Sequence, residues 1–123
     1  MQLDLKKNNL IVDKSFEFSL LIISLYQKLI GEKEYILSKQ LLRSGTSIGA
    51  NINEATAGCS KKDFIHKLTI SHKEAFETQY WLKLLDQSNL TKINVDIHLE
   101  EIERLIKILT SIIITARKNL NKQ

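Results

Sequence analysis

The chain has 123 residues, a formal net charge of +4, four glycines and no proline, and 43% of its residues are hydrophobic. This length fits a single domain, residues 1–123, and the apolar content excludes wholesale disorder. The shortage of glycine and proline disfavours a turn-rich β fold and favours helices. Cys59 is the only cysteine. An intrachain disulfide is therefore excluded, and we expect a reducing compartment, the cytoplasm.

We expect neither secretion nor insertion into a membrane. Residues 1–10 lack the apolar core of a signal peptide. The most apolar run, residues 18–26, is shorter than the about 20 residues that cross a bilayer.

The first helix is expected at about residues 14–30, after a loosely held lead-in, with Asp13 or Ser15 as its N-cap and Gly31 as its C′ residue. Its apolar residues form two stripes at helical spacing, one of Phe18, Ile22, Leu25 and Leu29 and one of Phe16, Leu20, Ile23 and Ile30. One stripe can line the core of the chain. The other needs a second partner, which favours an oligomer. The alternative is that both stripes merge into one broad core face.

The second helix is expected at about residues 35–56, although residues 43–55 are poor helix formers. Gly45 and Gly49 each cost a helix about 1 kcal/mol relative to alanine. An apolar stripe nevertheless continues at Leu37, Leu41, Ile48, Ile52 and Ala55. Gly45-x-x-x-Gly49 matches a membrane-helix dimer motif, but here it lies in a polar helix. We interpret it as close packing in a central, tightly surrounded helix.

The third helix is expected at about residues 60–86, capped by Ser60 with Asp63 three residues later. Its stripe is Phe64, Leu68, Ala75, Leu82 and Leu85, with Ser71 and Thr78 on the same face. These small residues match the small residues of the second helix, so we expect the two helices to approach closely.

The fourth helix is expected at about residues 94–119. Its seam alternates spacings of four and three through Val95, Leu99, Ile102, Ile106, Leu109, Ile113, Ala116 and Leu120. Four helices joined by short connections predict an all-α fold, an antiparallel up-down-up-down four-helix bundle.

Polar side chains gather on the second and third helices, and we expect them to form a structural network. A buried Arg43 or Lys67 would need Glu54, Glu74 or Glu77 as its partner, because an unpaired buried charge loses several kcal/mol. Such a network would fix helix register; the alternative is that it lines a ligand or partner groove. The predicted members are Arg43, Ser47, Asn51, Glu54, Lys67, Glu74 and Glu77.

The motifs of common catalytic sites are absent from the sequence, including the P-loop, the Rossmann fingerprint, zinc-finger spacing and the nucleophile elbow. A di-metal carboxylate bundle needs two Glu-x-x-His pairs. The chain offers only Asp63-x-x-His66 and His98-x-x-Glu101. We therefore expect no enzyme activity, no metal and no cofactor, and keep the di-metal carboxylate enzyme as an alternative.

Basic residues are concentrated towards the end of the chain: residues 104–123 contain five and no acidic residue. A basic helix end suits the helix dipole and can be merely solvated, or it can bind a polyanion. Under the second interpretation the candidates contact phosphates without reading bases. They are Lys61, Lys62, Arg104, Lys107, Arg117, Lys118 and Lys122.

Three blocks of the sequence resemble the bacterial family of 23S ribosomal RNA intervening-sequence proteins, over roughly residues 15–118. The blocks are Gln40-Leu41-Leu42-Arg43-Ser44-x-x-Ser47-Ile48-x-Ala50-Asn51-Ile52-x-Glu54-Ala55, Ser60-x-x-Asp63-Phe64-x-x-Lys67-Leu68 and Lys73-Glu74-Ala75-x-Glu77-Thr78-x-Tyr80-Trp81-Leu82-x-Leu84-Leu85. The resemblance implies an antiparallel four-helix bundle, a ring-like homopentamer and no known enzyme activity.

A related group, the accessory proteins of diversity-generating retroelements, resembles basic pentameric barrels that partner a reverse transcriptase and contact nucleic acid. From this resemblance we expect a non-enzymatic oligomeric binding or scaffold protein. Its partners would be further copies of the chain and RNA, DNA or a nucleic-acid-processing protein. The alternative is a purely structural or protein-interaction assembly that binds no nucleic acid.

Overall fold

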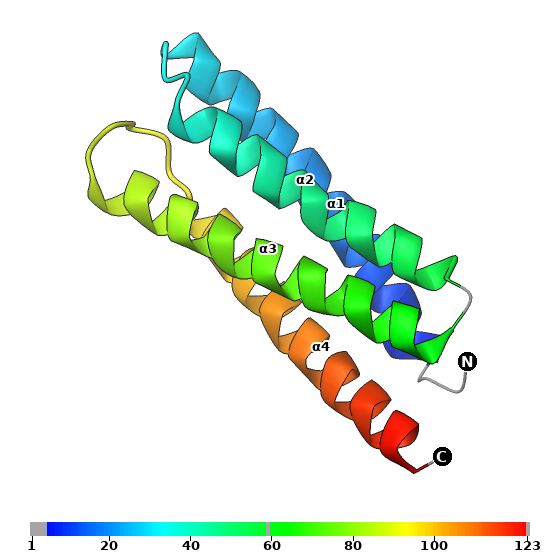
Figure 1. Ribbon diagram of the computed structural model, residues 1–123. Coiled ribbons are helices and arrows are strands. Elements are labelled where there is room, and N and C mark those ends of the chain that lie inside the picture. The colour runs from blue at the N-terminus through cyan, green and yellow to red at the C-terminus, as the bar shows by residue number, and fades with distance from the viewer. Residues whose placement is uncertain (1–4, 59, 123) are drawn as a thin grey trace.

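A computed structural model describes residues 5–58 and 60–122. In these ranges the chain forms four helices and no strand: α1 (Leu5–Gly31), α2 (Leu37–Thr56), α3 (Lys61–Gln87) and α4 (Asp96–Asn121). Figure 1 shows that the chain reverses its direction at each connection between them. Cys59 lies outside the described residues.

The helices pack in a cycle, as in a four-helix bundle. The backbones of α1 and α3 each lie close to those of both α2 and α4, whereas in the described residues the backbones of α1 and α3, and those of α2 and α4, lie farther apart across the core. Every helix contributes side chains with at most 1% of their surface exposed, among them Phe18, Ile22, Ile52, Leu68, Leu82 and Ile102. Burial of one apolar stripe per helix therefore builds a single core.

No helix in the described ranges is long and apolar enough to cross a membrane.

The prediction that α1 begins near residue 14 is wrong, because the helix already includes Leu5. Ile11 is only 2% exposed and packs in the core. It lies seven residues before Phe18, so it extends the buried stripe by two helical turns. Ser15 is not an N-cap: it is buried, and its hydroxyl donates to the carbonyl of Val12 at 3.1 Å within the helix. Asp13 likewise lies inside α1.

Lys33, not Gly31, takes the left-handed position that ends α1. Gly31 is the last helical residue, and Lys33 has φ 66°. The N–H of Glu34 donates to Leu29 O and the N–H of Lys33 to Ile30 O, both at 2.9 Å. These are the two hydrogen bonds of a Schellman motif.

The other helix boundaries lie within two residues of the predicted ones, and local capping explains each start. The carboxylate of Glu34 accepts the N–H groups of Ile36, Leu37 and Ser38 at 2.7–3.0 Å, which places the start of α2 at Leu37. Ser60 accepts the N–H of Asp63 at 3.1 Å, as predicted. The side chain of Asn94 accepts the N–H of Asp96 at 2.8 Å, at the start of α4.

The small residues of α2 divide between two neighbouring helices. A β-carbon on Gly45 would lie 2.9 Å from Ile22, and one on Gly49 would lie 3.3 Å from Ser15 O, both on α1. Towards α3, the hydroxyl of Ser71 donates to Ile48 O at 2.9 Å, and a buried hydrogen bond of 2.9 Å joins Thr78 to Ser44. Among the small residues of α2, the glycines therefore lie against α1, whereas Ser44 takes part in the contact with α3.

Candidate nucleic-acid interface

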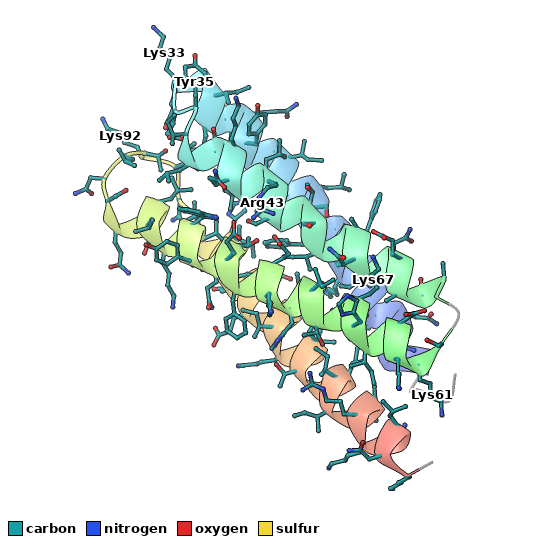
Figure 2. All side chains as sticks on the ribbon, viewed as in Figure 1. Lys33, Tyr35, Arg43, Lys61, Lys67 and Lys92 are labelled. Carbon is teal, nitrogen blue, oxygen red and sulfur yellow. The ribbon has the colours of Figure 1, made fainter. Side chains whose placement is uncertain are left out.

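Five of the seven predicted phosphate-contacting residues lie at one end of the molecule. Figure 1 shows the start of α3 and the end of α4 at that end, and Figure 2 shows Lys61 there. Within the described residues, none of the five forms an ion pair with a carboxylate. We call this group the basic end; it consists of Lys61, Lys62, Arg117, Lys118 and Lys122.

Arg104 and Lys107, the other two predicted residues, lie apart from the basic end. Arg104 precedes Arg117 by 13 residues, about 20 Å along the helix axis. Its guanidinium lies 3.4 Å from Glu101, and the ammonium of Lys107 lies 3.7 Å from Glu103. Neighbouring carboxylates thus partly offset both charges, which makes these residues weaker candidates for phosphate contacts.

A hollow of about 330 Å³ lies between the first half of α3 and the end of α4. Its surface is mostly apolar, while Lys62 and Arg117 bring a positive charge from each helix. The full lining is Lys62, Ile65, His66, Thr69, Arg117 and Leu120. Sequence reasoning selected the two cations and missed the other four. The spacing of residues 62, 65, 66 and 69 marks one helical face, but nothing in the sequence places Leu120 opposite it.

The positive charge of Arg117 also affects the pKa of a histidine on α3, His72. His72 is half-buried, and its Nε2 lies 2.8 Å from the hydroxyl of Thr110 on α4. Burial lowers the pKa of His72, and the charge of Arg117 lowers it further. Phe76 meets the His72 ring edge-on, with 4.9 Å between ring centroids.

The charged members of the predicted network join α2 to α3 within one chain. Arg43 binds both Glu74, at 3.1 Å, and Glu77, and Figure 2 shows it between the two helices. Lys67 reaches Glu54 at 3.0 Å. The expected burial is wrong: the Arg43 side chain is 51% exposed and that of Lys67 is 35% exposed. Both long side chains lie over the outside of the helix pair, where their charged ends stay hydrated.

Hydrogen bonds shift two pKa values in this network. The indole N–H of Trp81 donates to Glu77 at 2.9 Å and, together with Arg43, lowers the pKa of that carboxyl. The hydrogen bond with Glu77 in turn raises the pKa of Arg43. Asn51 donates instead to Ser47 O at 2.9 Å within α2, so these two residues are not joined to the ion pairs.

Three of the four residues in the second apolar stripe of α1 are exposed and Ile30 is partly buried, so the two stripes do not merge into one core face. Phe16 is 65% exposed, Leu20 53% and Ile23 39%. A groove of about 400 Å³ runs between this stripe and α2. Phe16 and Ile23 line it from α1, and residues of α2 complete it: Thr46, Gly49, Ala50 and Asn53.

A second exposed apolar surface lies on α3 and α4. Phe76 and Tyr80 of α3 are at least half exposed, and Ile114 of α4 is 49% exposed. Because the helices pack in the cycle α1, α2, α3, α4, the α3–α4 side of the bundle lies opposite the α1–α2 groove. Each chain therefore has two different apolar surfaces on opposite sides.

The acidic and histidine residues do not gather into a potential metal site: no three His, Cys, Asp or Glu side chains of the described ranges lie close enough to share an ion. Asp63 and His66 lie in the first two turns of α3. His98 lies in the first turn of α4 and is buried.

Over residues 5–58 and 60–122, the four packed helices define an all-α protein. The chain belongs to the family described as 23S rRNA-intervening sequence protein, whose model matches residues 7–111. The resemblance identified from the three sequence blocks is thereby confirmed. Arg117, Lys118 and Lys122 lie beyond the matched residues.

The chain is also similar to a solved structure, a protein of unknown function from the S23 ribosomal protein family of Bacteroides thetaiotaomicron VPI-5482. The two sequences are 48% identical and the TM-score is 0.83. The similarity covers 87% of this chain and 97% of the other. No curated protein matches the chain.

Proposed function

We propose that this protein is a non-enzymatic helical scaffold that self-associates in the cytoplasm and binds nucleic acid through its basic end. The observation that carries the proposal is the gathering of five cations at the start of α3 and around the end of α4, none of them in an ion pair within the described residues. Phosphates bind such groups without base readout, and counterion release supplies most of the affinity. Within each subunit, the helices form an antiparallel up-down-up-down bundle.

Self-association is supported by the two apolar surfaces on opposite sides of the bundle. A contact between the Phe16 surface of one copy and the Phe76 surface of the next would cover both. Such head-to-tail contacts close into rings when the rotation between copies permits it. A homopentamer is the ring that the family resemblance implies.

Salt-dependent binding tests the nucleic-acid proposal. Fluorescence anisotropy with labelled RNA and DNA should show an affinity that falls linearly with the logarithm of salt concentration. Each lost phosphate contact reduces the slope by roughly 0.7 on single strands and 0.9 on duplexes. The Arg117→Ala/Lys118→Ala variant should therefore reduce the slope by roughly 1.5.

The matched control is Arg104→Ala/Lys107→Ala. It also removes two positive charges from α4, but from residues that already pair with carboxylates. It should change the slope much less. Absence of binding to either nucleic acid at low salt would refute the proposal.

The exposed groove between α1 and α2 favours a second candidate, an assembly that binds only proteins. On this alternative, neither pair of substitutions changes the function of the assembly, and no oligonucleotide binds at any salt concentration.

A further inference from the structure

The hollow between α3 and α4 could contact a ligand through apolar side chains as well as through its two cations. Its volume of about 330 Å³ lies at the lower end of the range of small-molecule pockets, about 300–1,000 Å³. Ile65 and Leu120 give it apolar walls, and the lining includes no acidic residue. Backbone phosphates alone would gain nothing from such apolar walls.

Each of the two helices that line the hollow contributes one cation to it. Lys62 borders it from α3 and Arg117 from α4, and the remaining residues of the basic end neighbour these two in sequence or lie within five residues of Arg117. The hollow combines positively charged side chains with an apolar surface. These features are complementary to a polymer in which flat, largely apolar groups alternate with negative charges. A single-stranded nucleic acid has this pattern, because its bases are free to leave the stack.

We propose that the hollow receives an unstacked base of single-stranded nucleic acid while Lys62 and Arg117 contact the adjoining phosphates. The inference rests on the nucleic-acid binding proposed above and specifies its substrate class. In a duplex the bases are stacked and paired, so the hollow would remain empty and only the phosphate contacts would form. The basic end therefore prefers single strands to duplexes.

The lining also indicates that base identity matters little. Ile65 and Leu120 carry no polar side-chain atom, and the hydroxyl of Thr69 already donates to Ile65 O at 2.7 Å. The exposed ring of His66 provides a flat surface on which any base can stack. Stacking of this kind tolerates every base, because each has a π-face.

Filling the hollow without changing charge tests the proposal. In Thr69→Phe the larger side chain occupies the hollow, whereas Thr115→Phe places the same side chain at an exposed position of α4 outside it. The probes are a short mixed-sequence oligonucleotide and its duplex. Wild-type protein should bind the single strand about tenfold more tightly than the duplex. Thr69→Phe should remove that preference with duplex binding unchanged, and Thr115→Phe should preserve it.

His66→Ala is the second variant, because His66 is exposed and its loss does not threaten the fold. It should weaken single-strand binding about fivefold and leave duplex binding unchanged. An oligonucleotide containing 2-aminopurine gives an independent readout, since its emission changes when the base leaves the stack for the hollow.

The outcomes separate the two proposals. Equal binding of single strand and duplex, unaffected by Thr69→Phe and His66→Ala, would overturn the hollow as a base site and leave nucleic-acid binding intact. No binding of either probe at low salt would overturn both. Tighter binding of an acidic, apolar peptide than of the single strand, lost in Thr69→Phe, would overturn the nucleotide as occupant.

Discussion

Gly45 of α2 lies directly against Ile22 of α1. A β-carbon on residue 45 would stand 2.9 Å from both Cγ atoms of Ile22, which is fully buried. This contact explains why a residue that costs about 1 kcal/mol in a helix interior occupies the middle of α2. Close packing against the α1 core offsets the poor helix propensity.

Gly45→Ala should destabilise the protein by about 1–3 kcal/mol, because the added methyl group overpacks a core that has no room for it. The free energy of unfolding from urea titration measures the effect. Gly31→Ala is the matched control: nothing lies within 4 Å of its β-carbon position. It should be neutral or stabilising by up to about 1 kcal/mol. A Gly45→Ala protein as stable as the wild type would contradict the proposed packing.

The buried hydroxyl pair of Ser44 and Thr78 should behave as one unit. Thr78→Val keeps the side-chain shape but removes the hydrogen bond of 2.9 Å to Ser44. It should cost about 1 kcal/mol, because the Ser44 hydroxyl loses a partner. In a double-mutant cycle with Ser44→Ala, the double variant should lose less stability than the sum of the single variants. Strict additivity would show that the two hydroxyls do not interact.

Acid should destabilise the fold through two histidines. Burial, and then the charge of Lys28, lower the pKa of His98, although a hydrogen bond with the Leu21 backbone opposes the shift. Burial and Arg117 likewise lower the pKa of His72. The unfolded chain, whose histidine pKa is about 6.5, therefore binds protons first. The resulting stability is complete above about pH 6.5 and is lost as the pH falls through the folded pKa values.

Thermal melting at about pH 7.5 and pH 5.5 measures this loss. His98→Gln and His72→Gln should each reduce the decrease in Tm between the two pH values, even where the substitution changes Tm itself. A decrease in Tm that both variants leave unchanged would assign the acid sensitivity to other groups.

Phe16→Glu should dissociate the oligomer. Phe16 is 65% exposed on the α1 surface, so a charge there would leave the single chain folded but would oppose burial against another copy. Light scattering should then report the 14.2 kDa chain in place of a larger species. Ile36→Glu, which changes a residue 74% exposed in the α1–α2 connection, is the control and should leave the assembly intact. A wild-type protein of 14.2 kDa at micromolar concentration would exclude self-association.

Lys33→Gly should stabilise the protein by about 0.5 kcal/mol. Lys33 has φ 66°, a conformation that costs an L-residue about 1–2 kcal/mol and glycine almost nothing. The greater freedom of glycine in the unfolded chain cancels part of that gain. Chemical denaturation should show a higher midpoint with an unchanged m-value. Destabilisation would indicate a role for the lysine side chain that outweighs the backbone strain.

Apolar periodicity was sufficient to predict the number and order of the helices, because the seams of α2, α3 and α4 are long and regular. It failed at the start of α1, where Ile11 is separated from the main stripe by Asp13, Lys14 and a buried serine. A buried serine in a core seam looks like a cap in sequence. Only the packing of neighbouring helices shows that Ser15 is interior.

The candidate site was less accessible to sequence reasoning. Charge clustering identified Arg117 and Lys118, but the hollow depends on which face of α4 turns towards α3. Leu120 appeared in the sequence only as the last residue of a seam. The exposure of the ion pairs of Arg43 with Glu74 and Glu77 was also not predictable from the sequence. A periodic pattern assigns a residue to a face of the helix, but a long side chain can extend from that face to the solvent.

The ion pairs between α2 and α3 lie at two positions along the helices, and the helix that supplies the cation differs between them. Near the start of α2 the cation is Arg43 and α3 supplies the carboxylates, whereas near its end the anion is Glu54 and α3 supplies Lys67. If α2 packed on α3 in the reverse orientation, Arg43 would face Lys67 and Glu54 would face Glu74. Hydrated pairs of this kind contribute little to stability. Their order nevertheless disfavours the reverse orientation of α2 on α3, because like charges would face each other in a bundle that buries the same apolar seams.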